Sequence, residues 1–197
     1  MSERRARIER KTRETDVKVE LNLDGKGTCQ VQTGIGFLDH MLELFAHHGS
    51  LDLRASCKGD LHIDPHHSVE DTAICLGQSL AQALGEKRGI ARYGFYYVPM
   101  DESLARAVID LSGRAQFVYR VPRRDGSVGD LPFELVEEFW RAFCIQGKMN
   151  LHIELLYGSN MHHIVEATFK AVARALREAV RLRPGDENIP STKGDLA

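Results

Sequence analysis

The sequence HHSVEDT at residues 66–72 returns almost unchanged as HHIVEAT at residues 162–168, and this repetition decides the fold. On an α-helix, at about 100° per residue, Glu70 lies angularly between His66 and His67. Either imidazole can therefore share a cation with this carboxylate, whereas the two rings diverge too widely to bind one small ion together. We interpret each motif as serving two different metals, or one metal and a substrate. Two motifs would then build a two-metal site.

The repeat extends beyond these motifs. With an offset of 98 residues, Leu38 falls on Val136, His40 on Glu138, Phe45 on Phe143, Gly49 on Gly147 and Leu53 on Leu151. A loop two residues shorter then gives an offset of 96, at which the two histidine motifs align. We therefore predict two halves, residues 1–88 and 89–190, followed by a tail at residues 191–197.

Each half shows strands, a short helix, a strand and a long helix. In the first half we predict a hairpin of strands 17–23 and 29–33 around the turn Asp24-Gly25, a helix over 34–49, a strand over 51–55 and a helix over 66–84. In the second half we predict strands over 93–100, 104–111 and 117–121, a helix over 133–143, a strand over 151–156 and a helix over 162–182. These elements indicate an α+β fold, in which a mixed or antiparallel sheet carries its helices on one face and the two halves pack through their helices.

Composition limits the class of protein. The 197 residues are 43% hydrophobic, which suits one soluble globular unit or two small fused ones. The net charge of -2, with the signs interspersed, gives no electrostatic footprint for nucleic acid. We interpret the basic run 4–13 as a solvated terminus or a patch facing a neighbouring subunit. Four scattered cysteines without a C-x-x-C pair, and no apolar segment long enough for a membrane, indicate a reduced, cytoplasmic protein.

Doublets contain six of the nine histidines, at residues 47–48, 66–67 and 162–163. Imidazole and carboxylate suit manganese, iron, zinc or nickel, and the motifs contain no cysteine, which excludes thiolate sites. The repeat also pairs His40 with Glu138, and both residue types bind metals. The alternative for Glu138 is a solvated helix face within an acidic run.

Further motifs follow in order along the chain: RET at 13–15, GFLDHM at 36–41, HHG at 47–49, RYG at 92–94, DE at 101–102, DLSGR at 110–114, FK at 169–170 and STKG at 191–194. With these motifs the chain closely resembles the imidazoleglycerol-phosphate dehydratases of histidine biosynthesis over essentially its whole length. The resemblance implies a duplicated fold like domain 2 of ribosomal protein S5. It also implies two Mn²⁺ ions per active site, and trimers that assemble into a large octahedral particle with active sites between subunits.

The resemblance also implies roles for individual residues. The metal ligands would be His40, His66, His67, Glu70, His162, His163 and Glu166, and Glu138 is a further candidate at a position where the family commonly has histidine. Substrate contacts would come from Glu14, His40, His48, His66, His67, Glu70, Arg92, Arg114, His162, Lys170, Ser191, Thr192 and Lys193, with the cationic groups chiefly on the phosphate. The catalytic candidates are Glu14, His47, His48, Glu70 and Glu166.

The implied dehydration is difficult because the carbon-bound proton that must leave is not next to a carbonyl group. The substrate's imidazole ring can act as the electron sink if metals on its two nitrogens hold it as imidazolate. The hydroxyl then leaves through a diazafulvene-like intermediate, and loss of the proton gives an enol that becomes imidazole-acetol phosphate. Glu14 with His47 or His48 are the candidates for proton donor and base.

Two other functions remain open. A dinuclear metallohydrolase would use the same ligands to make a metal-bound hydroxide and would release phosphate from simple phosphoesters. A non-catalytic metal-binding or storage protein would make no use of Arg92, Arg114 or Lys193. For the dehydratase, we expect the tail around Lys193 to be mobile without ligand and to order over the substrate phosphate.

Overall fold

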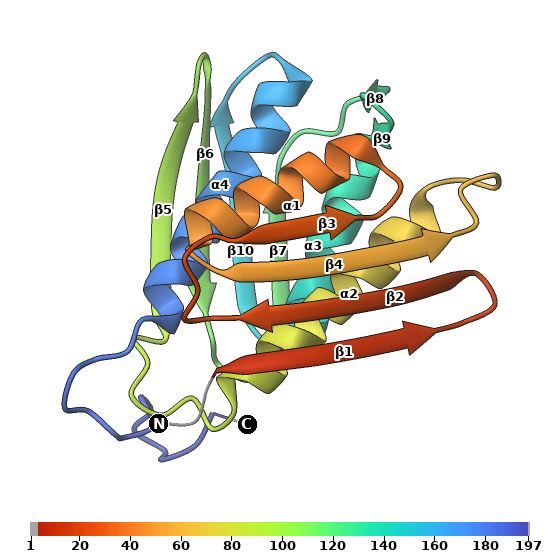
Figure 1. Cartoon of the computed structure of the whole chain (residues 1–197). Helices are drawn as coiled ribbons and strands as arrows, with labels where there is room; N and C mark the ends of the chain where they lie inside the picture. The colour runs from red at the N-terminus through yellow and green to blue at the C-terminus, as the bar shows by residue number, and fades with distance from the viewer. Residues whose placement is uncertain (1–3, 197) are drawn as a thin grey trace.

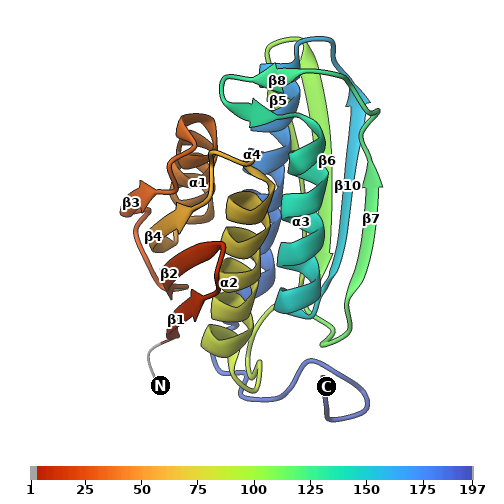
Figure 2. The same cartoon turned by 90° about the vertical axis from the view of Figure 1, so that its right-hand side faces the viewer.

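In residues 4–196, which the computed structural model describes, two four-stranded β-sheets form the outer layers and four α-helices fill the space between them (Figure 2). The first half contains β1 (Arg5–Lys11), β2 (Thr15–Asn22), β3 (Cys29–Gln32), α1 (Gly36–Gly49), β4 (Asp52–Gly59) and α2 (His66–Leu84). The second half contains β5 (Tyr93–Met100), β6 (Ser103–Asp110), β7 (Gln116–Arg120), β8 (Ser127–Val128), β9 (Leu131–Pro132), α3 (Glu134–Gly147), β10 (Asn150–Tyr157) and α4 (Met161–Val180).

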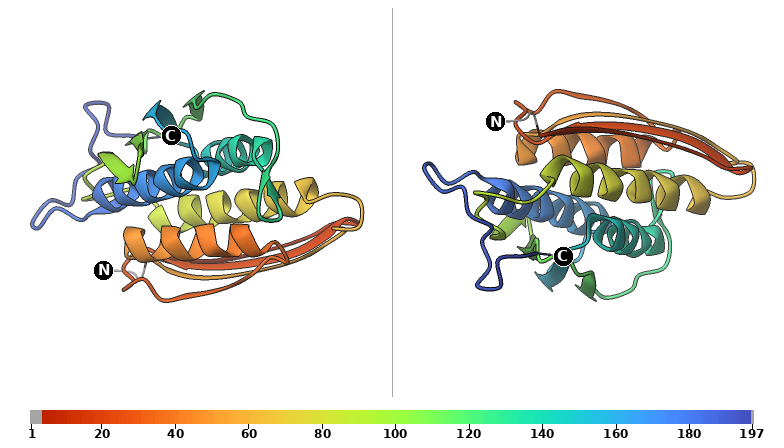
Figure 3. Two further views of the ribbon diagram at one scale, coloured as in Figure 1. Left: turned by 90° about the horizontal axis from the view of Figure 1, so that it is seen from above. Right: turned by 90° about the horizontal axis from the view of Figure 1, so that it is seen from below.

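The two large sheets have the same topology. Their strand orders are β1-β2-β4-β3 and β5-β6-β10-β7. In each sheet the last strand, β3 or β7, runs parallel to its neighbour, and the other pairs are antiparallel. The helices of each half cover one face of their own sheet, and the halves meet through these helices (Figure 3). The predicted α+β fold is therefore confirmed, while the division at residues 88 and 190 stays a prediction.

The second half carries an insertion of ten residues. Cys29 pairs with Leu53 in the first sheet and Phe117 pairs with Leu151 in the second, so the offset between the halves is 88 at β3 and 98 at β4. The ten additional residues lie between β7 and α3, where β8 and β9 form a small hairpin. This insertion reaches back to α1 of the first half.

Apolar side chains from both halves meet in the helical layers. On β2, Val17, Val19 and Leu21 are buried, as expected for a strand with one face on the core. The ring of Trp140 lies between the halves, with its centroid 4.4 Å from that of Phe169 on α4 and 6.1 Å from that of Phe45 on α1. These rings form a shared core, so neither half buries its helical face alone.

Each short helix packs against the long helix of the other half. α1 lies against α4, and α2 lies against α3 (Figure 2). Gly77 permits the close approach of α2 to α3, because a Cβ atom there would lie 2.6 Å from the carbonyl oxygen of Phe143. This packing between the halves brings side chains of α1 and α4 together, although the two helices belong to different halves.

One prediction about the first sheet is wrong. β2 and β3 do not form a hairpin, because β3 pairs with β4 in parallel and β2 lies between β1 and β4. The Asp52 carboxylate accepts hydrogen bonds from the amides of Lys26 (2.9 Å) and Thr28 (3.0 Å), and so holds the loop across the start of β4. Most of the basic run forms the edge strand β1, in which Arg5, Arg7 and Lys11 are exposed, and its prediction as a patch facing a neighbouring subunit stays a prediction. Arg10 of this strand forms an ion pair with Asp71 on α2.

The segment after α4 returns to the end of the molecule where the described chain begins (Figure 1). The Gly89 amide donates to the carbonyl oxygen of Asn188 at 2.9 Å, and the Arg183 amide donates to that of Gly89 at 2.7 Å. None of the helices in residues 4–196 is long and apolar enough to cross a membrane.

Candidate active site

The first cluster of polar side chains lies where α2 begins. His66 Nε2 is 3.7 Å from the Glu70 carboxylate, one helical turn away, and both side chains are partly exposed. His67 points elsewhere, with Nδ1 3.1 Å from Asp60 and Nε2 3.9 Å from Glu14. The two imidazoles therefore diverge, in agreement with the helical geometry of the motif, and each has a carboxylate of its own. We call these five residues the first cluster.

The second cluster lies where α4 begins and contains residues of both halves. His162 Nε2 is 3.1 Å from Glu166 Oε2, and His40 of α1 places its Nε2 3.8 Å from the same oxygen. His163 turns away and donates from Nδ1 to Glu102 at 2.5 Å. We call these five residues the second cluster. It depends on the packing of α1 against α4, which supplies His40 from the other half.

Phe37, in the first turn of α1, also faces the second cluster. Its ring centroid is 5.1 Å from that of His162 and 6.4 Å from that of His40. The insertion holds this end of the helix, because the Asp130 carboxylate accepts from the amides of Gly36 (2.6 Å) and Phe37 (2.9 Å). Asp130 thus fixes the turn that presents His40.

Electrostatics keep these groups in defined states. Burial raises the pKa of Glu166, but Lys170, whose Nζ lies 2.5 Å away, and His162 bring its pKa below the usual value. The hydrogen bond from His163 to Glu102 raises the pKa of His163. His48 differs, since burial and the nearby Lys170 lower its pKa. His47 lies beside it, with ring centroids 5.2 Å apart.

The donor set suits a divalent cation, but one chain does not complete the site. Imidazole nitrogens and carboxylates fit manganese and similar metals, and the partly exposed rings of His66 and His162 are open to a ligand. In the part of the chain that the structure describes, no group of three or more His, Cys, Asp or Glu side chains converges to hold a metal ion. Glu138 lies on α3 with its carboxylate 3.6 Å from Arg141 Nε. Its position as a ligand stays a prediction.

Some of the side chains predicted to bind the phosphate already have partners within the single chain. Arg92 forms an ion pair with Asp110 at 2.7 Å and donates from Nη1 to the carbonyl oxygen of Pro190 at 2.9 Å. Arg114 is exposed, as are Thr192 and Lys193. Ser191 Oγ accepts from the Lys193 amide at 3.2 Å. Arg92 thus joins the tail to the body of the protein, and the expected mobility of the tail remains a prediction.

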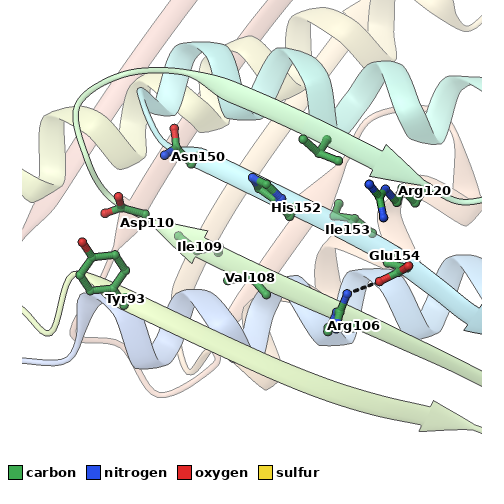
Figure 4. Close-up of a pocket in the computed structure, with 11 residues that line it drawn as sticks. Tyr93, Arg106, Val108, Ile109, Asp110, Arg120, Asn150, His152, Ile153 and Glu154 are labelled. Carbon is green, nitrogen blue, oxygen red and sulfur yellow. Dashed lines mark hydrogen bonds and ion pairs between the residues drawn. The ribbon is translucent and has the colours of Figure 1, made fainter.

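A further cavity of about 420 Å³ lies on the outer face of the second sheet, away from the helices (Figure 4). His152 lies in it beside Asn150, and Arg106 pairs with Glu154 at its edge. None of the residues predicted for the site lines this cavity. The sequence reasoning missed Asp60 and Asp130, and it quoted Glu102 in a motif without giving it a role.

The fold and the clusters define a class: a duplicated α+β enzyme with paired imidazole and carboxylate groups at the starts of its two long helices. Comparison with known proteins gives the family, since residues 33–176 match the family model described as imidazoleglycerol-phosphate dehydratase. The curated protein of that name from Salinibacter ruber is 56% identical to this chain, over 100% of this chain and 97% of the relative. The one from Methylorubrum extorquens is 53% identical, over 98% of this chain and 100% of the relative.

Solved structures that resemble this chain belong to the same family. The imidazoleglycerol-phosphate dehydratase from Staphylococcus aureus matches with a TM-score of 0.83 and 38% identity, over 91% of this chain and 99% of that one. The structure of the enzyme from Pyrococcus furiosus, in complex with (S)-C348, matches with a TM-score of 0.82 and 34% identity, over 96% of this chain and 100% of that one. The chain belongs to the imidazoleglycerol-phosphate dehydratase family, as the motifs predicted. It is a hydro-lyase that dehydrates imidazoleglycerol phosphate in histidine biosynthesis. Membership also implies dependence on a metal.

Proposed function

We propose that this dehydration takes place at a site of two Mn²⁺ ions formed between neighbouring subunits. The observation that carries the proposal is the pair of clusters at the starts of α2 and α4, each with a partly exposed imidazole beside a carboxylate. Neither cluster brings three ligands together within residues 4–196. A second copy of the chain, presenting its other cluster, would supply the missing ligands.

The ligands would be His66, His67 and Glu70 from one cluster and His40, His162, His163 and Glu166 from the other, with Glu138 as an additional candidate. When bound, the two metals would let the substrate's imidazole ring accept the electrons released as the hydroxyl leaves. The chain's own residues then have three tasks, which are to orient the ring, to move protons at the glycerol carbons and to hold the phosphate.

Glu14 has the geometry for proton transfer. Its side chain is 54% exposed, it lies in the turn between β1 and β2, and its Oε1 is 3.9 Å from His67 Nε2. A carboxylate beside a ligand and open to solvent can exchange a proton with the substrate carbon and then with water. The hydroxyl needs one proton to leave as water, and His48 or His47 is the candidate donor, so that the proton taken from carbon by Glu14 and the proton given to the hydroxyl balance.

Cationic groups would hold the phosphate. Arg114 is exposed and offers a fork of N–H donors, Lys170 lies one turn from Glu166, and Ser191, Thr192 and Lys193 belong to the tail. Arg92 already donates to the carbonyl oxygen of Pro190, so it can couple phosphate binding to closure of the tail.

Assembly follows from the incomplete clusters. We propose trimers that combine into a larger octahedral particle, with metal binding contributing to the association because ligands from separate chains are joined. The four cysteines are unpaired, with Cys57, Cys75 and Cys144 buried, which supports a reducing cytoplasmic location.

The test is a Mn²⁺ titration of metal-free protein, followed by activity, metal content and sedimentation. We expect activity and large particles to return together at two metals per chain, and both His67→Ala and His163→Ala to lose them. His152→Ala is the matched control, because that histidine lies on the outer sheet face. Turnover above a tenth of the original in either cluster variant, with full metal content, would refute the two-metal site. Phosphate release from simple phosphoesters would instead support a hydrolase.

A further inference from the structure

We propose that Glu102 and Asp60 are positioning residues that hold the Nδ1–H groups of His163 and His67, so that Nε2 of each ring is presented to the metal. The inference deepens the proposed function and rests on it. Neither carboxylate belongs to the predicted ligand set, and each reaches its histidine from a loop outside the helix. Metal-binding histidines commonly donate their second N–H group to a carboxylate, which fixes the tautomer and the ring orientation.

Glu102 divides its two oxygens between a loop and the imidazole. Oε1 accepts from the amides of Ser159 (3.1 Å) and Asn160 (2.7 Å), in the turn that leads into α4. Oε2 accepts from His163 Nδ1. Because the carboxylate carries no proton, the ring nitrogen must be the donor. Asn160 caps α4 in turn, since its side chain accepts from the His163 amide at 3.3 Å.

Asp60 performs the same task for His67. Both of its oxygens lie near Nδ1, at 3.2 and 3.1 Å, and its side chain is only 14% exposed. Its amide donates to the carbonyl oxygen of Glu14 at 3.1 Å, which ties this loop to the turn between β1 and β2. Asp60 thus fixes the His67 ring at Nδ1, and Nε2 faces the exposed Glu14 on the opposite side of the ring.

The two halves use one equivalent position in different ways. The hairpin of β1 and β2 corresponds to the hairpin of β5 and β6 at an offset of 88 residues, because Lys11 pairs with Asp16 as Pro99 pairs with Leu104. At this offset Glu102 is the counterpart of Glu14. In the second half this glutamate holds Nδ1 of the histidine. In the first half Asp60 has that task, and Glu14 is left exposed. The duplication has therefore freed one glutamate for chemistry and kept the other for positioning.

Glu102→Gln gives a sharp test, because the change is nearly isosteric. The amides of Ser159 and Asn160 require an acceptor at Oε1, so the new NH₂ group must face His163 and donate to Nδ1. The proton then moves to Nε2, the nitrogen that should bind metal. Long-range ¹⁵N–¹H spectra of the metal-free protein report the tautomer, with the His163 signal assigned by its loss in His163→Gln. The spectra are recorded at a pH high enough to leave the ring neutral, because Glu102 raises the pKa of His163, and we expect Nδ1–H in the original protein and Nε2–H in Glu102→Gln.

The second readout is Mn²⁺ affinity by calorimetry, which should fall about 10–100-fold in Glu102→Gln. Glu154→Gln is the matched control, because this glutamate pairs with Arg106 on the outer sheet face, and it should change neither readout. An unchanged tautomer with Mn²⁺ affinity within twofold of the original would overturn the proposal.

If Glu102→Gln does not fold, the same two measurements are made on Asp60→Ala, with the tautomer of His67 in place of that of His163. We expect a mixture of His67 tautomers and weaker Mn²⁺ binding, and a single Nδ1–H tautomer with unchanged affinity would overturn the proposal. Because the tautomer is measured without metal, failure of the two-metal site itself would appear separately, as absence of Mn²⁺ binding in the original protein.

Discussion

Removal of the Asp130 carboxylate should loosen the start of α1. The helix begins after Ile35, whose side chain makes no capping hydrogen bond, and its first free amides are satisfied by Asp130 from the other half of the chain. The carboxylate also faces the positive end of the helix dipole. In Asp130→Ala both hydrogen bonds and the charge are lost, and His40 lies one turn further along the helix.

The expected cost follows from known capping energies. Replacing an acidic cap by alanine costs about 0.5–2 kcal/mol. Asp130 is exposed, so water can replace part of the lost bonding, and we expect about 1 kcal/mol for Asp130→Ala. Asp130→Asn keeps an acceptor and loses only the charge, which should cost about 0.5 kcal/mol.

Urea unfolding of the metal-free protein at one fixed concentration measures this free energy. Asp125→Ala is the control, because this exposed aspartate lies in the same insertion and makes no hydrogen bond or ion pair identified in residues 4–196. A second measurement is Mn²⁺ affinity, which should fall in Asp130→Ala because the turn that presents His40 is less ordered. If Asp130→Ala and Asp125→Ala unfold at the same urea concentration, the capping role is wrong.

Three further outcomes are expected. Gly77→Ala should destabilise the protein by about 1–3 kcal/mol in thermal unfolding, because the new methyl group meets the backbone oxygen of Phe143. Asp52→Ala should cost about 1–2 kcal/mol at neutral pH. Backbone amides hold the pKa of Asp52 below its ordinary value, so its stabilisation is complete above that value, and the cost should fade in acid unfolding curves as the pH drops below it. Truncation after Asn188 should weaken substrate binding by about 2–3 kcal/mol with little change in stability. Equal weakening of an analogue without phosphate would show that Lys193 does not bind this group.

The elements of the fold were largely predictable because their signals are local. α2 and β5 begin and end at the predicted residues, since His66 follows a proline and Gly85 ends the apolar helical pattern. The pairing of β3 was not predictable in this way. Its partner β4 lies beyond a whole helix, and the choice between β2 and β4 depends on the loop that Asp52 holds.

The grouping of side chains in the candidate site was predictable where it repeats in sequence and not where it depends on distant contacts. The two histidine motifs were visible as a duplication, but Asp130 acts on a helix 94 residues away, and Glu102 acts on His163, 61 residues away. No spacing rule reports such contacts. The repeat pairs Glu138 with His40, and the fold keeps this correspondence, because α3 packs against α2 as α1 packs against α4; the ion pair of Glu138 with Arg141 was not predicted.

The halves differ in the contacts of equivalent residues around their two clusters. His40 lies 3.8 Å from Glu166, whereas Glu138 pairs with Arg141, and Glu14 is exposed, whereas its counterpart Glu102 is held by a loop. The imidazole ring of the substrate carries its glycerol phosphate arm on one side only, so proton transfer is needed on one side of the ring. A symmetric pair of halves would place equal groups on both sides. Divergence at these positions gives a pseudo-symmetric scaffold an asymmetric site, while the packing of α1 against α4 makes the second cluster dependent on both halves of one chain.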